Sequence, residues 1–319
     1  MNRTYQIAAV VVTYNRKDCL VQCMKALAAQ TYLPATIIIV DNASTDGTME
    51  ALHDNGFNVK DHERIRCGKT EIMYERLEQN MGGAGGFYHG IKTGYEMNLY
   101  DAFWVMDDDG LPHRDSLKHM VGYLDHYDYI SPLCLAAENH AMLAFDHKGV
   151  PLASDYIAKF AVDGVVHHDA FPFNGVMYSR TFVEKVGLPR KEFFIWGDEA
   201  NYHRRGIVQG FEPVVIVDAI HYHPLNRAEY YDMNMLGKNR KIILTNSLLR
   251  LYCMHRNAAA NALMDFPCKA AKNLLLRYLV YSKYYLSIEK SFKHWRVFNN
   301  AFFAGLFGLF EGHKKYLKQ

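Results

Sequence analysis

The apolar run Ala102–Met106 ends directly in three adjacent carboxylates, Asp107, Asp108 and Asp109. The run is rich in residues typical of buried strands. Three carboxylates at the tip of such a strand cannot all stay ionised without a counter-charge, because burying an unpaired anion is very costly. Alternate residues of an extended chain point the same way, so Asp107 and Asp109 can coordinate one divalent cation, Mg²⁺ or Mn²⁺. The alternative is a solvated acidic turn, since a glycine and a proline follow.

Apolar runs alternate with helical patterns through the first part of the chain. Segments 7–12 and 36–40 are typical of buried strands, and apolar residues at helical spacing follow the first of them. This rhythm predicts an α/β fold with a mostly parallel sheet flanked by helices. Ligands of such sheets bind at the carboxyl ends of the strands, which is where the unusual polar motifs of this chain fall.

The remaining sequence gives weaker patterns. Further strands are expected near 57–60 or 72–77, 129–133 and 212–220. The stretch 138–169 is polar and irregular, and is a candidate cover for an acceptor site. Beyond residue 234 glycine is sparse and Leu, Tyr, Lys and Arg dominate, so helices should fill the tail. The predicted organisation is a sheet domain, 1–233, followed by a C-terminal helical region, 234–319.

Bulk composition argues against several classes of function. The net charge is +2 with neutral histidines, so no global field favours nucleic acid. The six cysteines show no CxxC pair or zinc-ligand spacing, which predicts a reduced, cytoplasmic protein. Segment 1–7 lacks the apolar core of a signal peptide, and no apolar stretch reaches the length of a membrane span.

The C-terminal segment 292–319 interleaves Phe, Leu and Trp with lysine and arginine. This pattern is typical of an amphipathic helix on a membrane surface, which predicts peripheral contact with the inner face of the cell membrane. A packing helix of a second domain has the same pattern. Helical tails of this kind also often pair into homo-oligomers.

Two polar loops are candidate ligand contacts. Asp41 follows the strand at 36–40, where a carboxylate can accept hydrogen bonds from a base ring or a ribose hydroxyl. Its alternative is a turn or capping residue. Segment Gly82–Gly86 lets backbone approach a ligand and opens a helix whose N-terminus favours phosphate. It is not a P-loop, because no Gly-Lys-Ser/Thr follows, and a plain tight loop is its alternative.

Asp198 and Glu199 follow Trp196 and Gly197 at the start of a predicted helix. Adjacent acids in a first turn stabilise the helix dipole. Beside an aromatic wall, a carboxylate can also keep its pKa high enough to act as a general base toward an acceptor hydroxyl.

His221 and His223 flank Tyr222 at the end of the last predicted strand, so both face one way. Either can complete a metal site with Asp107 and Asp109. A pair of this kind at a strand end is more often incidental than a ligand.

In combination these motifs resemble the inverting, family-two nucleotide-sugar glycosyltransferases with the GT-A fold. The matching segments, in order along 6–223, are VVVTYNR from Val10, IIIVDNASTDGT from Ile37, NMGGAGGF from Asn80, WVMDDDG from Trp104 and FFIWGDEANYHRRG from Phe193. The glycine-rich segment and DDD are most similar to the rhamnosyl- and galactofuranosyltransferases that build bacterial surface polysaccharides. The WGD-E form and the HYH ending are closer to galactofuranosyltransferases.

The resemblance implies a role for each motif. The loop Thr13, Tyr14 and Asn15 touches the nucleotide, and Asp41 binds its uracil or thymine ring. The loop beside the nucleotide and donor sugar matches Asn80, Gly83 and Gly86. The metal ligands match Asp107, Asp109 and His221, with His223 as the alternative to His221, and Asp108 lies near the donor sugar. The cation is Mn²⁺ or Mg²⁺.

The resemblance also places the general base in the pair Asp198 and Glu199, with Glu199 at the usual position of the base. The chain departs from the family pattern here, because glutamate replaces a second aspartate and Asn201 stands where an acid is common. Trp196 stacks on the acceptor sugar or is a core aromatic.

Several partners and functions follow from the resemblance. The favoured donor is UDP-galactofuranose, followed by dTDP-rhamnose, and the acceptor is a glycan on a lipid carrier. One alternative is a non-catalytic nucleotide-sugar-binding module on the same fold. A nucleotidyltransferase is a second alternative, but it needs a glycine-rich basic loop after the first strand, where this chain has Thr-Tyr-Asn-Arg.

Overall fold

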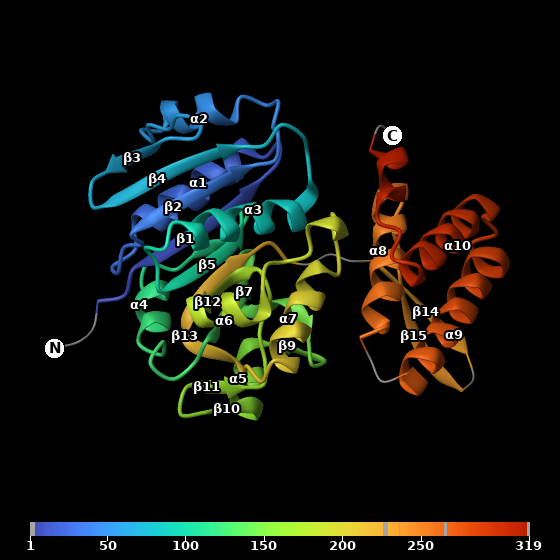
Figure 1. The fold of residues 1–319 in the computed structure, drawn as a ribbon. Helices are drawn as coiled ribbons and strands as arrows, with labels where there is room; N and C mark the ends of the chain where they lie inside the picture. The colour runs from blue at the N-terminus through green and yellow to red at the C-terminus, as the bar shows by residue number, and fades with distance from the viewer. Residues whose placement is uncertain (1–3, 226–228, 236, 265–266, 318–319) are drawn as a thin grey trace. The chain divides into compact units, whose positions relative to one another are not determined.

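The computed structural model describes residues 4–225, 229–235, 237–264 and 267–317. The chain divides into two compact units (Figure 1). The first, here the sheet unit, comprises Met1–Lys191 and Tyr202–Asn226. The second, here the helical unit, comprises Glu192–Asn201 and Arg227–Gln319. Each unit is described by itself.

The sheet unit is built on one large sheet. Its strands are β1 (Ile7–Thr13), β2 (Thr36–Asp41), β3 (Arg64–Cys67), β4 (Thr70–Arg76), β5 (Ala102–Asp107), β6 (Leu111–Pro112), β7 (Tyr129–Ala136), β8 (Asn139–His147), β9 (Val150–Leu152), β10 (Ala161–Val162), β11 (Val165–His167), β12 (Asn174–Ser179) and β13 (Pro213–His223). The main path runs β10-β11-β13-β7-β12-β5-β1-β2-β4-β3. Strands β5, β1, β2 and β4 are parallel, and β12 is antiparallel to both β5 and β7.

Helices cover both faces of this sheet (Figure 1). They are α1 (Lys17–Ala28), α2 (Thr48–Asp54), α3 (Gly82–Glu96), α4 (Ser116–Val121), α5 (Ala153–Phe160), α6 (Arg180–Val186) and α7 (Asp198–Val208), of which residues 198–201 belong to the helical unit. The predicted α/β fold with a mostly parallel sheet flanked by helices is confirmed.

Alternation along the central strands sends side chains into two hydrophobic layers. In β1, Ile7, Ala9 and Val11 pack with residues of α1, α2 and α4, whereas Val10 and Val12 pack with residues of α3 and α6. Burying each of these aliphatic side chains stabilises the fold by about 1.5–3 kcal/mol. Because both faces are covered, the central strands are continuous apolar runs in the sequence and do not alternate with polar residues.

The structure differs from the expectation for residues 138–169. The stretch is ordered and holds the pair β8–β9, helix α5 and the short strands β10 and β11. Tyr156 of α5 and Leu143 of β8 pack into a small core with Phe171. These elements are short and half-exposed, so their apolar residues are too few to form a visible period. Of the two positions given for the third strand, 72–77 overlaps β4 and 57–60 contains no strand.

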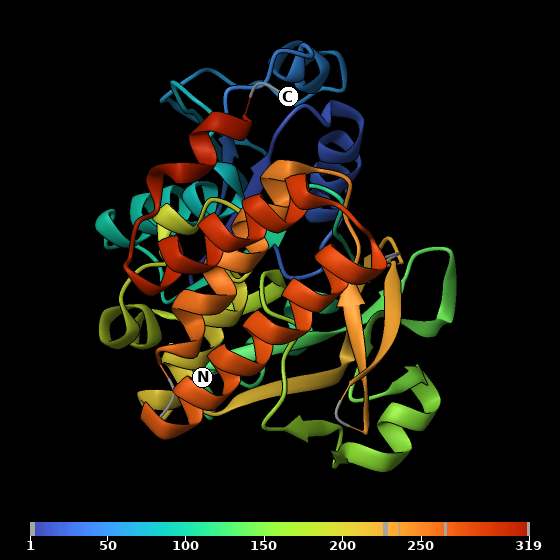
Figure 2. The ribbon, with the colours of Figure 1, turned by 90° about the vertical axis from the view of Figure 1, so that its right-hand side faces the viewer.

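The helical unit contains a hairpin, β14 (Tyr230–Met235) and β15 (Lys238–Ile243), and the helices α8 (Leu248–Ala262), α9 (Pro267–Lys283) and α10 (Phe292–Leu306). A π-helical turn, Tyr284–Ile288, and a 3-10 turn, Glu311–Tyr316, also belong to this unit, and a 3-10 turn at Lys191–Phe193 lies where the two units divide. Figure 2 shows α9 and α10 side by side. The hairpin was not expected, and the predicted boundary at 233/234 lies inside β14.

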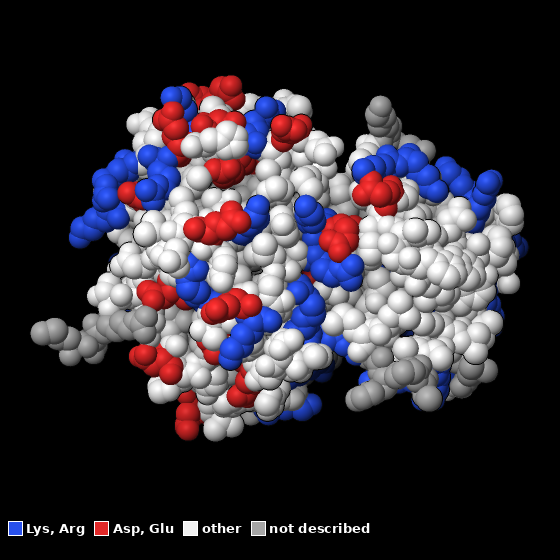
Figure 3. Space-filling view, viewed as in Figure 1, with Lys and Arg blue, Asp and Glu red and all other residues white. Residues whose placement is uncertain are grey.

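An aromatic core holds the helical unit together. Phe298 of α10 is fully buried among Tyr278, Tyr281 and Tyr285. On the face drawn in Figure 3, this unit presents a broad area without charged residues that is bordered by lysine and arginine. Within the described part of the chain, no helix has both the length and the apolarity needed to cross a membrane.

Candidate active site

The tips of three neighbouring parallel strands bring the predicted polar residues of the sheet unit together. In the β1–β2 pair Thr13 lies opposite Asp41, and in the β1–β5 pair Val12 lies opposite Asp107. The carboxyl ends of β1, β2 and β5 therefore meet at one edge of the sheet (Figure 1). This is the edge at which open α/β sheets bind their ligands.

Asp108 is the most buried of the three consecutive aspartates, with no exposed surface. Its Oδ2 accepts a hydrogen bond from Thr13 Oγ1 at 2.7 Å, and its Oδ1 lies 2.7 Å from Arg16 Nη2. Arg16 also donates to Asp109 Oδ2 at 2.5 Å. Sequence reasoning did not select Arg16, although it is the one cation in the TYNR segment that ends the first strand.

The three carboxylates differ in their acidity. Burial, followed by the charges of Asp109 and Asp108, raises the pKa of Asp107 to about 7. Burial also raises the pKa of Asp108 to about 6, against the opposing charge of Arg16. For Asp109, burial is outweighed by contact with His223 and the charge of Arg16, which lower its pKa to about 2. The corner is thus crowded with negative charge that Arg16 compensates only in part.

Both histidines of the HYH motif adjoin the aspartates. His223 Nε2 lies 3.5 Å from Asp109 Oδ1, and although burial opposes it, this contact raises the pKa of His223. His221 is fully buried, and neither of its ring nitrogens has a hydrogen-bond partner. Its ring packs on the backbone, since a Cβ at Gly110 or Gly175 would lie 2.4 or 2.6 Å from a ring nitrogen. Burial lowers the pKa of His221 to about 3, so the ring is neutral.

The chemistry of these side chains fits a divalent cation. Among the described residues no three His, Cys, Asp or Glu side chains converge as metal ligands do. Nevertheless, Asp109 Oδ1 is buried without a hydrogen bond, and the ring of His221 is neutral with two unpartnered nitrogens. Burial, and then the charges of Asp109 and Asp108, raise the pKa of Asp107. Carboxylate oxygens with an imidazole nitrogen suit Mn²⁺ and are compatible with Mg²⁺.

The carboxylate of Asp41 is fixed in a buried position at the tip of β2. Its Oδ1 accepts a hydrogen bond from the backbone N–H of Ser44 at 2.8 Å, and its Oδ2 accepts one from the Tyr74 hydroxyl at 2.5 Å. The loop after β1 is tied to this region, because Asn15 Oδ1 accepts from the backbone N–H of Thr45 at 2.7 Å. Tyr14, in the same loop, is 44% exposed and available to a ligand.

Asn42 joins the β2 loop to the glycine-rich segment. Its Nδ2 donates to the carbonyl oxygen of Gly82 at 3.2 Å, and its Oδ1 accepts from the backbone N–H of Met81 at 3.3 Å. Asn80 Oδ1 accepts from the backbone N–H of Gly82 at 2.7 Å, which closes the turn before α3. Sequence reasoning missed Asn42, and its position in the polar loop directly after Asp41 was the available signal.

The two glycines selected from this segment have different surroundings. A Cβ on Gly86 would lie 2.4 Å from Val12 Cγ1 and 3.0 Å from Asn42 Nδ2, so glycine lets α3 pack on β1. A Cβ on Gly83 would meet nothing within 4 Å. Gly83 therefore borders open space, as a residue beside a ligand should, and Gly86 is a packing position.

The predicted acceptor and base residues belong to the helical unit. Trp196 is half-buried and packs against the aromatic core of that unit. Asp198, at the start of α7, is 5% exposed, and Glu199 is partly exposed. Glu199 Oε2 accepts a hydrogen bond from the backbone N–H of Gly197 at 2.9 Å, which caps the helix.

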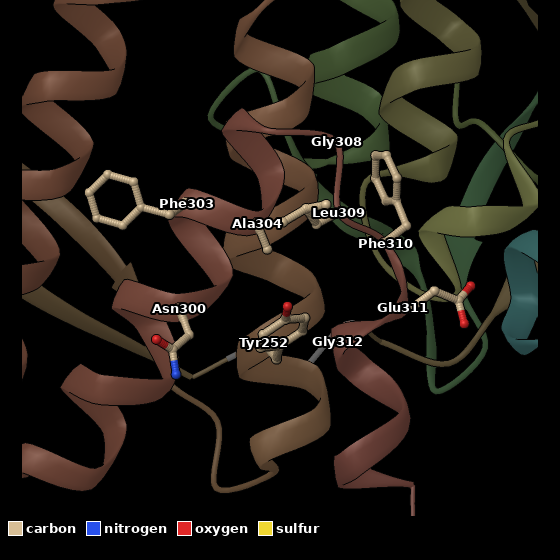
Figure 4. Close-up of a pocket in the computed structure, with 9 residues that line it drawn as sticks. All are labelled: Tyr252, Asn300, Phe303, Ala304, Gly308, Leu309, Phe310, Glu311 and Gly312. Carbon is tan, nitrogen blue, oxygen red and sulfur yellow. The ribbon is translucent and has the colours of Figure 1, made fainter.

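One pocket lies within the helical unit (Figure 4). Its volume is about 520 Å³, and it is lined by Tyr252 of α8, by Phe303 and Ala304 of α10 and by the segment 308–312. The walls are mostly apolar, and Glu311 is the one carboxylate among the residues drawn. A single exposed carboxylate gives this pocket no acid–base pair, so we assign it no catalytic role.

The fold of the chain and a family model together identify it as a glycosyltransferase. The family model of glycosyl transferase family 2 matches residues 8–179, and the chain belongs to this family. The predicted family membership is thereby confirmed, and the protein is a glycosyltransferase enzyme that uses a nucleotide-sugar.

Curated glycosyltransferases match the chain at moderate sequence identity. The chain is 29% identical to galactofuranosyltransferase GlfT1 of Mycobacterium tuberculosis over 235 residues, covering 71% of this chain and 73% of the relative. It is 27% identical to GlfT1 of Mycolicibacterium smegmatis over 239 residues, covering 72% and 74% of the two chains. Abequosyltransferase RfbV of Salmonella typhimurium is 30% identical over 123 residues, covering 37% and 32%.

Solved structures share the fold at low sequence identity. Residues 1–349 of TarS from S. aureus superpose with a TM-score of 0.56 at 15% identity, covering 94% of this chain and 81% of that one. Mannosyltransferase PcManGT from Pyrobaculum calidifontis, in complex with GDP-Man and Mn²⁺, superposes with a TM-score of 0.54 at 14% identity, covering 98% and 88%. These likenesses support the GT-A fold.

Proposed function

We propose that the protein is an inverting, metal-dependent galactofuranosyltransferase. It transfers the sugar of UDP-galactofuranose to a hydroxyl group of a cell-surface polysaccharide or lipid-linked glycan. The observation that carries the proposal is the meeting of Thr13, Asp41 and Asp107 at the carboxyl edge of a parallel sheet. The similarity to GlfT1 supports the choice of donor. dTDP-rhamnose is the second candidate, because the glycine-rich segment and DDD also resemble rhamnosyltransferases.

The sheet unit binds the donor. Asp41, held by Ser44 and Tyr74, has lone pairs left to accept an N–H of the uracil ring. The exposed loop at Tyr14 and Asn15 contacts the nucleotide, and Asn80 and Gly83 border the sugar and the diphosphate. Gly83 suits this role because its outer side is open and lets a ligand reach the backbone.

Asp107, Asp109 and a histidine would hold Mn²⁺ or Mg²⁺. We keep His221 as the histidine ligand, because its ring is neutral and both of its nitrogens lack a hydrogen-bond partner, and His223, which contacts Asp109, is the alternative. A cation bound there supplies charge neutralisation to the diphosphate as it leaves. Asp108, buried and fixed by Thr13 and Arg16, would lie near the donor sugar and hold the loop after β1 against the tip of β5.

The acidic pair of α7 supplies the base. Glu199 or Asp198 takes the proton of the acceptor hydroxyl while that oxygen forms a bond to the anomeric carbon. The bond from the anomeric carbon to the diphosphate oxygen breaks, and UDP leaves with its electron pair. One displacement from the opposite face inverts the configuration without a covalent intermediate. Trp196 stacks on the acceptor sugar.

We also propose that the helical unit contacts an anionic membrane surface at the inner face of the cell membrane. Leu275 and Leu279 of α9 are 61% and 45% exposed, and Phe303 of α10 and Phe307 directly after it are 42% and 73% exposed. The exposed residues Lys272 and Lys283 on α9 and Lys293 and Arg296 on α10 flank these apolar side chains. Exposed apolar residues framed by cations are typical of surfaces that bind anionic lipid.

Flotation with vesicles tests this contact. The double variant Leu275→Glu/Leu279→Glu should lose binding to anionic vesicles, whereas Val162→Glu on the sheet unit should keep it. Equal binding of the double variant and the unchanged protein would contradict the membrane contact.

A donor panel tests the proposed activity. The measurement is release of nucleoside diphosphate from UDP-galactofuranose, dTDP-rhamnose and UDP-pyranose sugars, with Mn²⁺ and a glycan acceptor. UDP-galactofuranose should give the fastest release, and at least one of Asp198→Asn and Glu199→Gln should slow it by about 10²–10⁴-fold. Full activity in both variants, with intact folding, would sink the assignment of the base.

A further inference from the structure

The loop that leads into the acidic pair has an unusual backbone. Phe194, Trp196 and Gly197 all adopt positive φ, at 66°, 61° and 86°. For a bulky aromatic residue this conformation is strained and costs about 1–3 kcal/mol of conformational free energy. Such strain persists only where the surrounding structure holds the backbone in place, and it clusters at functional sites.

Side chains of α8 hold this loop by its carbonyl groups. Asn257 Nδ2 lies 2.9 Å from the carbonyl oxygens of both Phe193 and Ile195 and 2.5 Å from that of Trp196. Arg256 Nη2 donates to the same Phe193 oxygen at 2.6 Å. Both side chains are fully buried, so water does not compete for these contacts.

A third residue of α8 extends the contact to the first turn of α7. Asn261 Nδ2 donates to the carbonyl oxygen of Gly197 at 2.8 Å, and Asn261 Oδ1 accepts from Asn201 Nδ2 at 2.9 Å. The N–H of Gly197 is itself bonded to Glu199. The backbone on both sides of Gly197 is therefore fixed, and with it the start of the helix that bears Asp198 and Glu199.

Helix α8 is a rigid support for this purpose. A Cβ at Gly305 of α10 would lie 2.1 Å from the carbonyl oxygen of Arg256, so the two helices are in backbone contact. Arg256 Nη1 also donates to the carbonyl oxygen of Phe310 at 2.7 Å. A fully buried guanidinium that bonds carbonyl oxygens is costly, and packing alone does not require it.

We propose that Arg256, Asn257 and Asn261 are positioning residues for sugar transfer. They hold the loop 193–197 in the one strained conformation that presents Asp198 and Glu199 to the acceptor hydroxyl. The inference rests on the proposed function, because it needs the catalytic base to lie in that pair. It assigns the helical tail a part in catalysis that the acidic motif alone does not reveal.

The variant Asn257→Asp tests the proposal. It preserves the shape of the side chain and the acceptor for Arg256 Nε, but it replaces the N–H donors with an oxygen facing three carbonyl oxygens. We expect kcat to fall about 100-fold, because a displacement of about 1 Å at a reacting group costs that much. The KM for UDP-galactofuranose and the stoichiometry of UDP binding should not change. Asn300→Asp, the same change on the exposed face of α10, is the matched control and should stay within about twofold.

A milder variant keeps the test decisive if Asn257→Asp does not fold. Asn261→Ala removes only the contacts to Gly197 and Asn201, and kcat should fall about 10-fold with unchanged UDP binding. Activity that falls only in proportion to the fraction of protein able to bind UDP would show a purely structural role and overturn the inference. Full kcat in either folded variant would also overturn it. The proposed function fails separately, if Asp198→Asn and Glu199→Gln both remain fully active.

Discussion

Arg16 Nη2 lies 2.7 Å from Asp108 Oδ1, so the loop after β1 supplies a positive charge to the aspartates at the tip of β5. The ion pair joins a residue 44% exposed in its side chain to one fully buried. It explains how three consecutive carboxylates can be tolerated at a strand tip before any cation is bound. Arg16 is therefore a counter-ion of the site, and its removal should have a measurable cost.

Arg16→Met should destabilise the metal-free protein by about 1–2 kcal/mol. Removing one partner of a buried ion pair costs more than this, but the exposure of Arg16 weakens the interaction. Added Mn²⁺ should shrink the deficit, because a cation replaces the lost charge. Thermal unfolding with and without Mn²⁺ measures both effects. Arg66→Met, which removes a largely exposed partner of Glu71, is the control and should cost less than about 0.5 kcal/mol. An Arg16 deficit that Mn²⁺ leaves unchanged would count against a shared charge site.

Gly83→Ala and Gly86→Ala separate ligand contact from packing. Gly86→Ala should destabilise the protein by about 1–3 kcal/mol, because the new methyl group overlaps Val12. Gly83→Ala should fold normally, since its Cβ meets no atom of the protein, but should raise the KM for the donor. Unfolding curves and donor kinetics on both variants check this. An unchanged donor KM in Gly83→Ala would remove Gly83 from the donor site.

Tyr74→Phe should weaken UDP binding as well as the fold. The variant leaves the buried Asp41 Oδ2 without its phenol donor, which should lower the free energy of unfolding by about 1–2 kcal/mol. It also allows the carboxylate to turn away from the base ring. Tyr100→Phe breaks a similar buried hydrogen bond, to Thr36 at the opposite end of β2, and should lower stability without affecting UDP. Calorimetric titration with UDP distinguishes the two variants. Equal UDP affinity in both would argue against Asp41 as the base-binding residue.

Much of the sheet and its polar edge could be predicted from the sequence, whereas some site residues could not. Strands β1, β2 and β5 could be predicted because they are buried on both faces and so are continuous apolar runs. The polar residues at their tips followed from the end of each run. Arg16 and Asn42 were missed because their importance depends on partners far away in sequence, Asp108 and Gly82. The hairpin of the helical unit was missed because its strands are mostly exposed and short, so the alternation of Tyr231, Met233 and Met235 in β14 is too brief to stand out.

His255 should make stability depend on pH. It is fully buried on α8, its Nδ1 lies 3.1 Å from Arg277, and its Nε2 lies 2.9 Å from the Tyr285 hydroxyl. Burial, with the charge of Arg277, lowers the pKa of His255 well below its usual value. Below about pH 6.5 the unfolded chain therefore takes up a proton that the folded chain does not. The free energy of unfolding keeps its full value above that pH and decreases as the pH falls below it.

The matched variants isolate this proton. Between about pH 6.5 and 5, His255→Gln should reduce the slope of unfolding free energy against pH by about 1.4 kcal/mol per pH unit. His126→Gln removes an exposed histidine and should leave the slope unchanged. Chemical denaturation at several pH values measures both slopes. Parallel slopes for the unchanged protein and His255→Gln would show that His255 does not stay neutral in the fold.

The central claim is that the strand-tip carboxylates act with a divalent cation to release the nucleoside diphosphate. The most direct measurement is UDP release from UDP-galactofuranose by protein stripped with chelator and then titrated with Mn²⁺, beside Asp107→Asn and Asp109→Asn. We predict that turnover disappears in chelator, returns with Mn²⁺ in the unchanged protein, and fails to return in the two variants. Undiminished turnover in chelator, or full recovery of both variants, would contradict the account.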